Sequence, residues 1–242
     1  MALIAQSFLG ADVRKRVNAL LAADTDYLTA HDIASAATWA DKLRDANTGG
    51  ARQKTRQWHF VDIEIAAPDL DAACFNHPPI PSGTVASDGP AADCVVDKIN
   101  QFAAELANPA TDHEEQIVAL KFLLHFVGDL HQPLHSSDDN DRGGNDKRVS
   151  AAGFRAGNLH HSWDTEFVGQ LETDAKSIAS DLIGHISHAQ AGKWQAGTPS
   201  DWAKECRAGS LPRHLPEKAR TPLRPARGEE NSRMTYWHAA PK

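Results

Sequence analysis

The sequence predicts a mainly α protein, a single helical domain with long loops. Apolar residues recur at intervals of three and four along most of the chain, as on a helix face that packs against a core, and alternating strand patterns are nearly absent. The chain has 242 residues, of which 41% are hydrophobic and 24% charged. This composition is typical of a folded globular protein, and the length supplies one domain with ample core volume.

The expected helices follow one another along the chain and are separated by polar loops. In order, the apolar spacing predicts a short helix through Leu3–Phe8, a second through Val13–Leu21, a third capped by Thr29 and running to Leu43, and a fourth over Val95–Leu106. It then predicts a fifth from about 112 to 131, opened by a Thr111/Glu114 capping box, a sixth from Asn158 to about Leu171, a seventh through Ile178–Ile186, and a last one from Ser200. Trp58–Val61 is expected to be extended or irregular, and residues 76–90, rich in Pro, Gly and Ser, to form a loop.

Charge divides the chain into two parts. Residues 206–242 hold eight Lys/Arg, three Asp/Glu and five prolines, which predicts an extended or disordered tail after a domain over 1–205. The net charge of −7 argues against simple electrostatic coating of nucleic acid. No apolar stretch approaches the roughly 20 residues of a membrane span, so we expect no membrane association.

The strongest chemical signal lies in the central apolar helix. His125 and Asp129 are four residues apart and therefore share one helix face, about 6 Å apart along the axis. A carboxylate on such an apolar helix costs several kcal/mol unless it is paired or bound to a metal, and zinc accepts both imidazole nitrogen and carboxylate oxygen. Pro133 ends the helix, so His135 can turn back towards the same place. The alternative is a helix end whose polar side chains face solvent.

The same spacing recurs at His160 and Asp164. Together with His135 they would supply three protein ligands and leave coordination positions open, as hydrolytic zinc sites require. The alternative is an exposed first turn in which Asp164 favours the positive helix end. Asp41, Arg44 and His59 could complete a second site in combination. Taken one at a time, an Asp41–Arg44 surface ion pair and a packed histidine are the favoured explanations.

Five motifs occur in order and together resemble one family. They are Trp39-Ala40-Asp41, Trp58-His59-Phe60-Val61-Asp62, the run from His125 through Asp129 and His131 to His135, Gly143-Gly144-Asn145, and Asn158-Leu159-His160 followed by Asp164. Over residues 2–205 the chain resembles the zinc-dependent single-strand nucleases of the S1/P1 type, with zinc-dependent phospholipase C as a more distant structural relative.

The resemblance implies a mostly helical fold with three zinc ions at the bottom of a cleft. It assigns one zinc to Asp41, His59, His125 and Asp129, and a lone zinc to His135, His160 and Asp164. A third zinc would share Asp129 and take an N-terminal Trp together with a His five residues later. Arg44 is expected to steady the phosphate, Phe60 and Asp62 to stack on and hydrogen-bond a nucleobase, and His131 to support the ligands without being one.

The implied activity is endonucleolytic hydrolysis of single-stranded DNA and RNA to 5′-phosphate products, with 3′-nucleotidase activity, in which Asp41 and Arg44 are catalytic. Phosphodiester hydrolysis needs an activated water and relief of phosphate charge, and paired divalent ions supply both. Two alternatives remain: a phospholipase C-like phosphodiesterase, which Phe60 and Asp62 disfavour, and an inactive zinc-binding relative.

Both ends of the chain depart from the family pattern. Ile4-Ala5 aligns inside the first family helix, so the Trp and His ligands would fall upstream of Met1, as would a signal peptide. We therefore expect two bound zinc ions and greatly reduced activity for the chain as given, a monomer, and a periplasmic or secreted full-length form. Cys74 and Cys94 bracket the Pro/Gly loop, and a disulfide there would stabilise by about 3 kcal/mol; the alternative is two free thiols.

Overall fold

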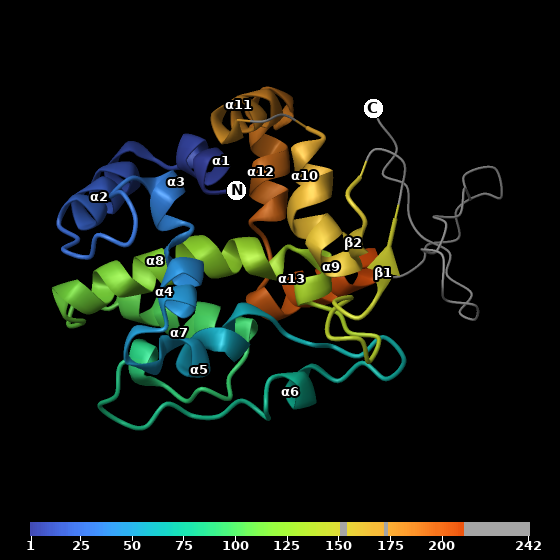
Figure 1. Cartoon of the computed structure of the whole chain (residues 1–242). Coiled ribbons are helices and arrows are strands. Elements are labelled where there is room, and N and C mark those ends of the chain that lie inside the picture. The colour runs from blue at the N-terminus through green and yellow to red at the C-terminus, as the bar shows by residue number, and fades with distance from the viewer. Residues whose placement is uncertain (151–153, 172–173, 211–242) are drawn as a thin grey trace.

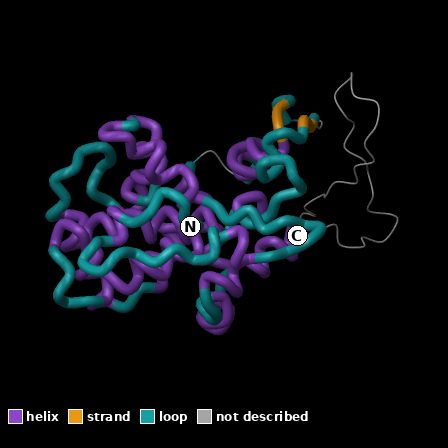
Figure 2. Tube along the Cα trace, turned by 90° about the horizontal axis from the view of Figure 1, so that it is seen from below, coloured by secondary structure: helices purple, strands orange, loops and turns teal. Residues whose placement is uncertain are grey.

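The computed structural model describes residues 1–150, 154–171 and 174–210, and helices dominate them, as the sequence predicts (Figures 1 and 2). The helices are α1 (Ala2–Phe8), α2 (Ala11–Ala22), α3 (Ile33–Ala36), α4 (Trp39–Ala46), α5 (Ala51–Thr55), α6 (Leu70–Ala73), α7 (Val95–Ala107), α8 (His113–Leu130), α9 (Leu159–His161), α10 (Phe167–Gly169), α11 (Ala175–His185), α12 (His188–Trp194) and α13 (Pro199–Ser210). Short 3-10 turns are η1 (Thr48–Gly50), η2 (Arg56–His59), η3 (Ala86–Asp88) and η4 (Pro133–His135), and η5 (Ser162–Glu166) is a π-helical turn. Within the described residues no helix is long and apolar enough to cross a membrane.

The only strands among the described residues form a small antiparallel ribbon. β1 (Arg148–Val149) pairs with β2 (Gly157–Asn158), with Arg148 opposite Asn158. Asn158 also caps α9 by accepting a hydrogen bond from the backbone N–H of His161, as predicted. The ribbon therefore fixes the start of the segment that carries His160 and Asp164.

The core is built around α8, which crosses the middle of the molecule and packs along α7 (Figure 1). The ring of Phe122 on α8 stacks on Phe102 of α7 at 4.6 Å and on Phe126 at 5.0 Å, and the edge of Trp39 meets it at 5.1 Å. Aromatic pairs of this kind add to the stabilisation from burial. They fix the rotation of α8 about its axis, and with it the direction of His125.

Two lysines are fully buried in this core, which the sequence pattern does not predict. Lys121 Nζ lies 2.8 Å from Asp24 Oδ2 and 4.0 Å from the ring centre of Trp39. Lys98 Nζ donates to the carbonyl of Ala86 and lies 4.0 Å from the ring centre of Trp58. A buried ammonium is tolerated when paired and placed over an aromatic face, so both lysines tie loops to the central helices.

Helix starts differ from the predictions where a neighbouring Asp makes the cap. The expected third helix is two helices, and α3 is capped by Asp32, whose carboxylate accepts from the N–H groups of Ala34 and Ser35, rather than by Thr29. Asp112, not Thr111, caps α8. At both positions the Asp carboxylate accepts hydrogen bonds from backbone N–H groups two or three residues later, which are free in the first turn of a helix. Helices α5, α6 and α12 are too short to give a readable apolar period.

The predicted domain boundary at residue 205 falls inside α13, which continues to Ser210. Arg207 donates hydrogen bonds to the carbonyls of Glu64 and Ile65, so this turn packs on the body of the protein. The remainder of the predicted tail, 211–242, lies outside the described residues.

The predicted disulfide between Cys74 and Cys94 is present, and Cys206 is free. Cys74 directly follows α6, and Cys94 is the N-cap residue of α7. The bond closes a loop with a sequence separation of 20 and contributes about 3 kcal/mol in the chain-entropy model.

A pair of glutamates holds the same loop to α7 and α8. Glu105 accepts a hydrogen bond from the backbone N–H of Ala86, and Glu115 accepts from the Ser87 hydroxyl at 2.9 Å. Burial, followed by the nearby charge of Glu105, raises the pKa of Glu115 to about 7. A carboxyl whose folded pKa lies above its unfolded value stabilises the fold when protonated, and this contribution is lost as pH rises through the folded pKa.

We therefore predict that Glu115→Gln flattens the pH dependence of stability. The wild-type chain should lose unfolding free energy relative to this variant as the pH rises from about 4.5 to about 7, the unfolded and folded pKa values of Glu115, measured by urea unfolding. Glu114→Gln, at the exposed neighbouring position, is the matched control and should follow the wild type. Parallel curves for wild type and Glu115→Gln would contradict this account.

Candidate metal centre

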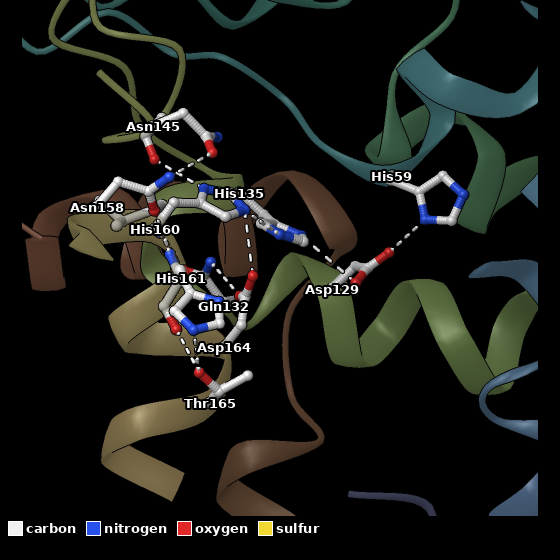
Figure 3. A network of polar contacts seen from close by, with 12 residues as sticks. His59, Asp129, Gln132, His135, Asn145, Asn158, His160, His161, Asp164 and Thr165 are labelled. Atoms are coloured by element: carbon white, nitrogen blue, oxygen red, sulfur yellow. Dashed lines mark hydrogen bonds and ion pairs between the residues drawn. The ribbon is translucent and has the colours of Figure 1, made fainter. Parts of the chain in front are cut away.

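The seven predicted ligands lie together in two adjoining groups. Figure 3 shows five of them, namely His59, Asp129, His135, His160 and Asp164. The Asp41 cluster consists of Asp41 on α4, His59 at the end of η2, and His125 and Asp129 on α8. The His135 cluster consists of His135 at the end of η4, His160 on α9 and Asp164 on η5. Five separate segments therefore contribute to one region of the molecule.

The Asp41 cluster has the spacing of a tetrahedral metal site. Asp129 Oδ2 lies 2.9 Å from His59 Nδ1 and 3.0 Å from His125 Nε2, and those two nitrogens are 3.2 Å apart. Asp41 Oδ1 lies 3.5 Å from His125 Nε2 and 3.7 Å from His59 Nδ1. Zinc bonds of about 2.1 Å in tetrahedral geometry put ligand atoms about 3.4 Å apart, so Asp41, His59 and His125 fit one ion, and Asp129 lies beside the two histidines.

Local structure fixes which nitrogen of His125 faces the cluster. Its Nδ1–H donates to the carbonyl of Ala37 at 2.7 Å, so Nε2 is the nitrogen that faces the cluster. That carbonyl lies in the bend between α3 and α4, in a region that the apolar spacing predicts to be one continuous helix. His59 is almost fully buried, and its Nε2 has no hydrogen-bond partner among the described residues. Its Nδ1 is the atom that faces the cluster.

The Asp41 cluster contains two carboxylates, and their negative charge favours binding of a cation. Burial by itself lowers the pKa of His125, but hydrogen bonds to Asp129 and Asp41 outweigh it and raise the pKa to about 10. Burial likewise opposes ionisation of Asp129, yet hydrogen bonds from His125, His135 and His59 hold its pKa well below the usual range. The carboxylates of Asp41 and Asp129 therefore stay ionised, and the protonated His125 offsets part of their charge. A divalent ion that displaced the proton from His125 would supply this positive charge instead.

The His135 cluster presents two imidazoles and one carboxylate. His135 Nε2 and His160 Nε2 are 3.2 Å apart, and Asp164 Oδ2 lies 3.5 Å from His160 Nε2. His160 Nδ1–H donates to the carbonyl of Gly143 at 2.8 Å, so Nε2 is the nitrogen that faces the cluster. Gln132 donates to Asp164 Oδ1 at 2.9 Å and so turns Oδ2 towards the histidines. Three donors with room for further ligands match a hydrolytic zinc site.

The Gly143-Gly144-Asn145 motif packs against the His135 cluster and orients His160. Gly143 has a φ of +59°, and a Cβ there would lie 2.5 Å from the carbonyl oxygen of Leu134. A side chain is therefore excluded, and the close approach lets the Gly143 carbonyl reach the ring of His160. Asn145 accepts a weak hydrogen bond from Asn158, the cap of α9, at 3.4 Å.

Asp129 joins the two clusters. Its Oδ2 belongs to the Asp41 cluster, while its Oδ1 lies 3.4 Å from His135 Nδ1. His131, predicted to support the ligands, instead donates to the carbonyl of Val127 and packs its ring 5.8 Å from Trp202 of α13. The supporting contacts in the structure come from Gln132, Ala37 and Gly143. Two of these three are backbone carbonyls, which no side-chain pattern identifies.

The predicted phosphate- and base-binding residues border the clusters. Arg44 Nη1 lies 2.8 Å from Asp41 Oδ1, and its Nε lies 3.1 Å from Asp45. Phe60 and Asp62 follow η2, and Val61 between them donates its N–H to the carbonyl of His135 at 2.7 Å. Burial and the charge of Asp138 raise the pKa of Asp62 to about 6. The backbone between Phe60 and Asp62 therefore lies against the backbone of His135.

A further group of potential donors, Cys74, His77 and Asp97, is not available to a metal. Cys74 is bonded to Cys94, and His77 is held between Asp71 and Asp97 at 3.2 and 2.9 Å. The hydrogen bonds that its ring nitrogens donate to the two carboxylates raise the pKa of His77, and both nitrogens are therefore occupied.

Comparison with known proteins assigns the family. The family model of the S1/P1 nuclease matches residues 1–216, so the chain belongs to the S1/P1 nuclease family. Nuclease S1 of Aspergillus oryzae is 33% identical over 189 residues, covering 76% of this chain and 58% of that protein. Nuclease P1 of Penicillium citrinum is 29% identical (73% and 66%), and Endonuclease 2 of Arabidopsis thaliana is 30% identical (73% and 56%). The chain thus spans less than two thirds of the length of these relatives.

We predict about two tightly bound zinc ions per chain, one for each cluster. His125→Ala and His160→Ala should each lower the content to about one, measured by elemental analysis after dialysis. His131→Ala removes a histidine outside both clusters and should leave the content unchanged. A double variant His125→Ala/His160→Ala that still holds two ions would contradict the assignment.

Proposed function

We propose that this protein is a zinc-dependent endonuclease that hydrolyses single-stranded DNA and RNA to 5′-phosphate products, and that it also acts on 3′-nucleotides. The observation that carries the proposal is the convergence of seven donors from five segments into two adjoining clusters. Family membership supports it independently. Each of the two clusters would hold one zinc ion.

The chain's own residues would orient the reactants. Bound zinc would lower the pKa of a water and offset charge on the phosphoryl oxygens. The Asp41 side chain is 46% exposed against 13% for Asp129, so Asp41 is the carboxylate that a water can reach. Its pKa is lowered because hydrogen bonding and charge from His125 outweigh burial, so it is ionised and accepts a hydrogen bond from the attacking water.

Arg44 is placed to neutralise the phosphate in the transition state. Its guanidinium is held by Asp41 and Asp45, and its side chain remains 28% exposed. As water adds to phosphorus, the phosphorus–O3′ bond breaks, leaving a 5′-phosphate and a 3′-hydroxyl. Negative charge grows on the equatorial oxygens, and a charge-assisted bond from Arg44 stabilises it more than in the ground state.

Phe60 and Asp62 would select single strands. An aromatic ring stacks on any base, which gives affinity with little sequence preference. A base in a duplex is already stacked and paired, so only an unpaired base reaches such a position. With a pKa of about 6, Asp62 is ionised at neutral pH and accepts hydrogen bonds from base N–H groups. We propose that the chain acts as a monomer, and the disulfide supports a periplasmic or secreted location.

The proposal is tested by incubating the zinc-loaded protein with heat-denatured DNA, RNA, duplex DNA, a 3′-nucleotide and phosphatidylcholine vesicles. We expect hydrolysis of both single-stranded polymers and of the 3′-nucleotide, with little attack on the duplex. Hydrolysis of phosphatidylcholine alone would favour the phospholipase C-like alternative. No hydrolysis of any substrate by a protein with two bound zinc ions would overturn the proposal.

We predict that Arg44→Ala lowers kcat on denatured DNA about 10²- to 10³-fold, because it removes one preorganised donor to the transition state. The zinc content should stay at about two, which separates this loss from loss of metal. Arg16→Ala, on exposed α2, is the control and should retain wild-type kcat. An unchanged kcat for Arg44→Ala would remove Arg44 from the mechanism.

A further inference from the structure

An open groove lies beside the metal centre. It has a volume of about 440 Å³ and is lined by Arg52, Gln53, Arg56, Gln57, Ala91 and Ala92. One wall is formed by α5 and η2, and the other by the loop that precedes α7. None of these residues belongs to the proposed catalytic machinery.

The groove is cationic in an acidic protein. Residues 42–57 contain five basic side chains and a single acidic one, Asp45, whereas the whole chain carries a net charge of −7. The Arg52 side chain is 52% exposed, and within the described part of the chain its guanidinium pairs only with Asp45, at 3.4 Å. The Arg56 side chain is exposed and makes no hydrogen bond or ion pair with the described residues. Two guanidinium groups one helical turn apart are therefore available to an anion.

A chain of ion pairs connects the groove to the Asp41 cluster. Asp41 pairs with Arg44 at 2.8 Å, Arg44 with Asp45 at 3.1 Å, and Asp45 with Arg52 at 3.4 Å. η2 makes a second connection, because it begins at Arg56 and ends at His59. Its three residue steps span about 6 Å. The groove residues are thus linked to the Asp41 cluster both by these ion pairs and by the backbone of η2.

Both walls of the groove are held in place. Lys54 Nζ donates to the carbonyl of Asp88, and Trp58 Nε1 donates to the carbonyl of Pro90, each at 2.9 Å. The disulfide at Cys94 anchors the end of the same loop. These bonds bring the loop to within reach of α5 and fix the position of Ala91 and Ala92. A ligand would therefore enter a formed groove and would not have to assemble one.

We propose that this groove binds the phosphodiester backbone of the substrate strand beyond the scissile phosphate. Two arginines bind phosphate oxygens through paired N–H donors, and the amide groups of Gln53 and Gln57 add donors of the kind that contact phosphate and sugar. The lining has no aromatic ring, so it offers no surface on which a base stacks and contacts the backbone without reading sequence. The proposal rests on the proposed nuclease function for its substrate.

The test compares Arg52→Ala/Arg56→Ala with the wild type on a ten-nucleotide oligothymidylate and on thymidine 3′-phosphate. We expect KM for the oligonucleotide to rise about tenfold with kcat unchanged, and KM for the mononucleotide to stay constant because it does not reach the groove. The matched control is Lys15→Ala/Arg16→Ala on α2, which removes the same charge elsewhere and should change neither KM.

Binding is measured separately by fluorescence anisotropy of the labelled oligonucleotide at increasing salt. Loss of two phosphate contacts should reduce the slope of log Kd against log salt by about 1.4, at about 0.7 per contact for single strands. If the wild type hydrolyses nothing but binds with the steeper slope, the groove stands and the proposed function fails. The groove proposal is overturned if the double variant binds like the wild type, or if KM rises equally for the mononucleotide.

Discussion

The buried carboxylate of Asp129 is the constraint on which the rest of the site depends. It lies on the last turn of an apolar helix, where an isolated charge would cost several kcal/mol. The structure meets this cost by bringing His59, His125 and His135 to its two oxygens at 2.9, 3.0 and 3.4 Å. Those three contacts draw η2 and η4 onto α8 and set the two ligand clusters side by side. Two zinc ions bound in these clusters would also offset the negative charge of Asp129.

The fold delivers these side chains through a small number of rigid supports. Aromatic stacking between α7 and α8 fixes the direction in which α8 presents its polar residues. Pro133 ends that helix and starts η4, which returns His135 to the site. Backbone carbonyls at Ala37 and Gly143 then select the ring nitrogen that faces each cluster. The ligands are thus oriented by aromatic packing, a proline and backbone carbonyls, none of which takes part in the proposed reaction.

Much of this arrangement could be predicted from the sequence, because the spacing of His125 and Asp129, and of His160 and Asp164, is a direct consequence of helical geometry. The main α class, the cap at Asn158 and the Cys74–Cys94 pair followed from equally local signals. The bend between α3 and α4 could not be predicted, because apolar residues continue through it. The buried Lys98 and Lys121 depend on partners distant in sequence, and so does the groove between Arg56 and Ala92. Such features need the folded chain.

Zinc-edge anomalous diffraction from crystals of the zinc-loaded protein tests the central claim most directly. The account predicts two strong peaks, one among Asp41, His59, His125 and Asp129, and one among His135, His160 and Asp164, with metal–ligand distances of about 2.0–2.2 Å. Peaks located elsewhere on the chain, or both clusters empty in crystals that contain zinc, would contradict it.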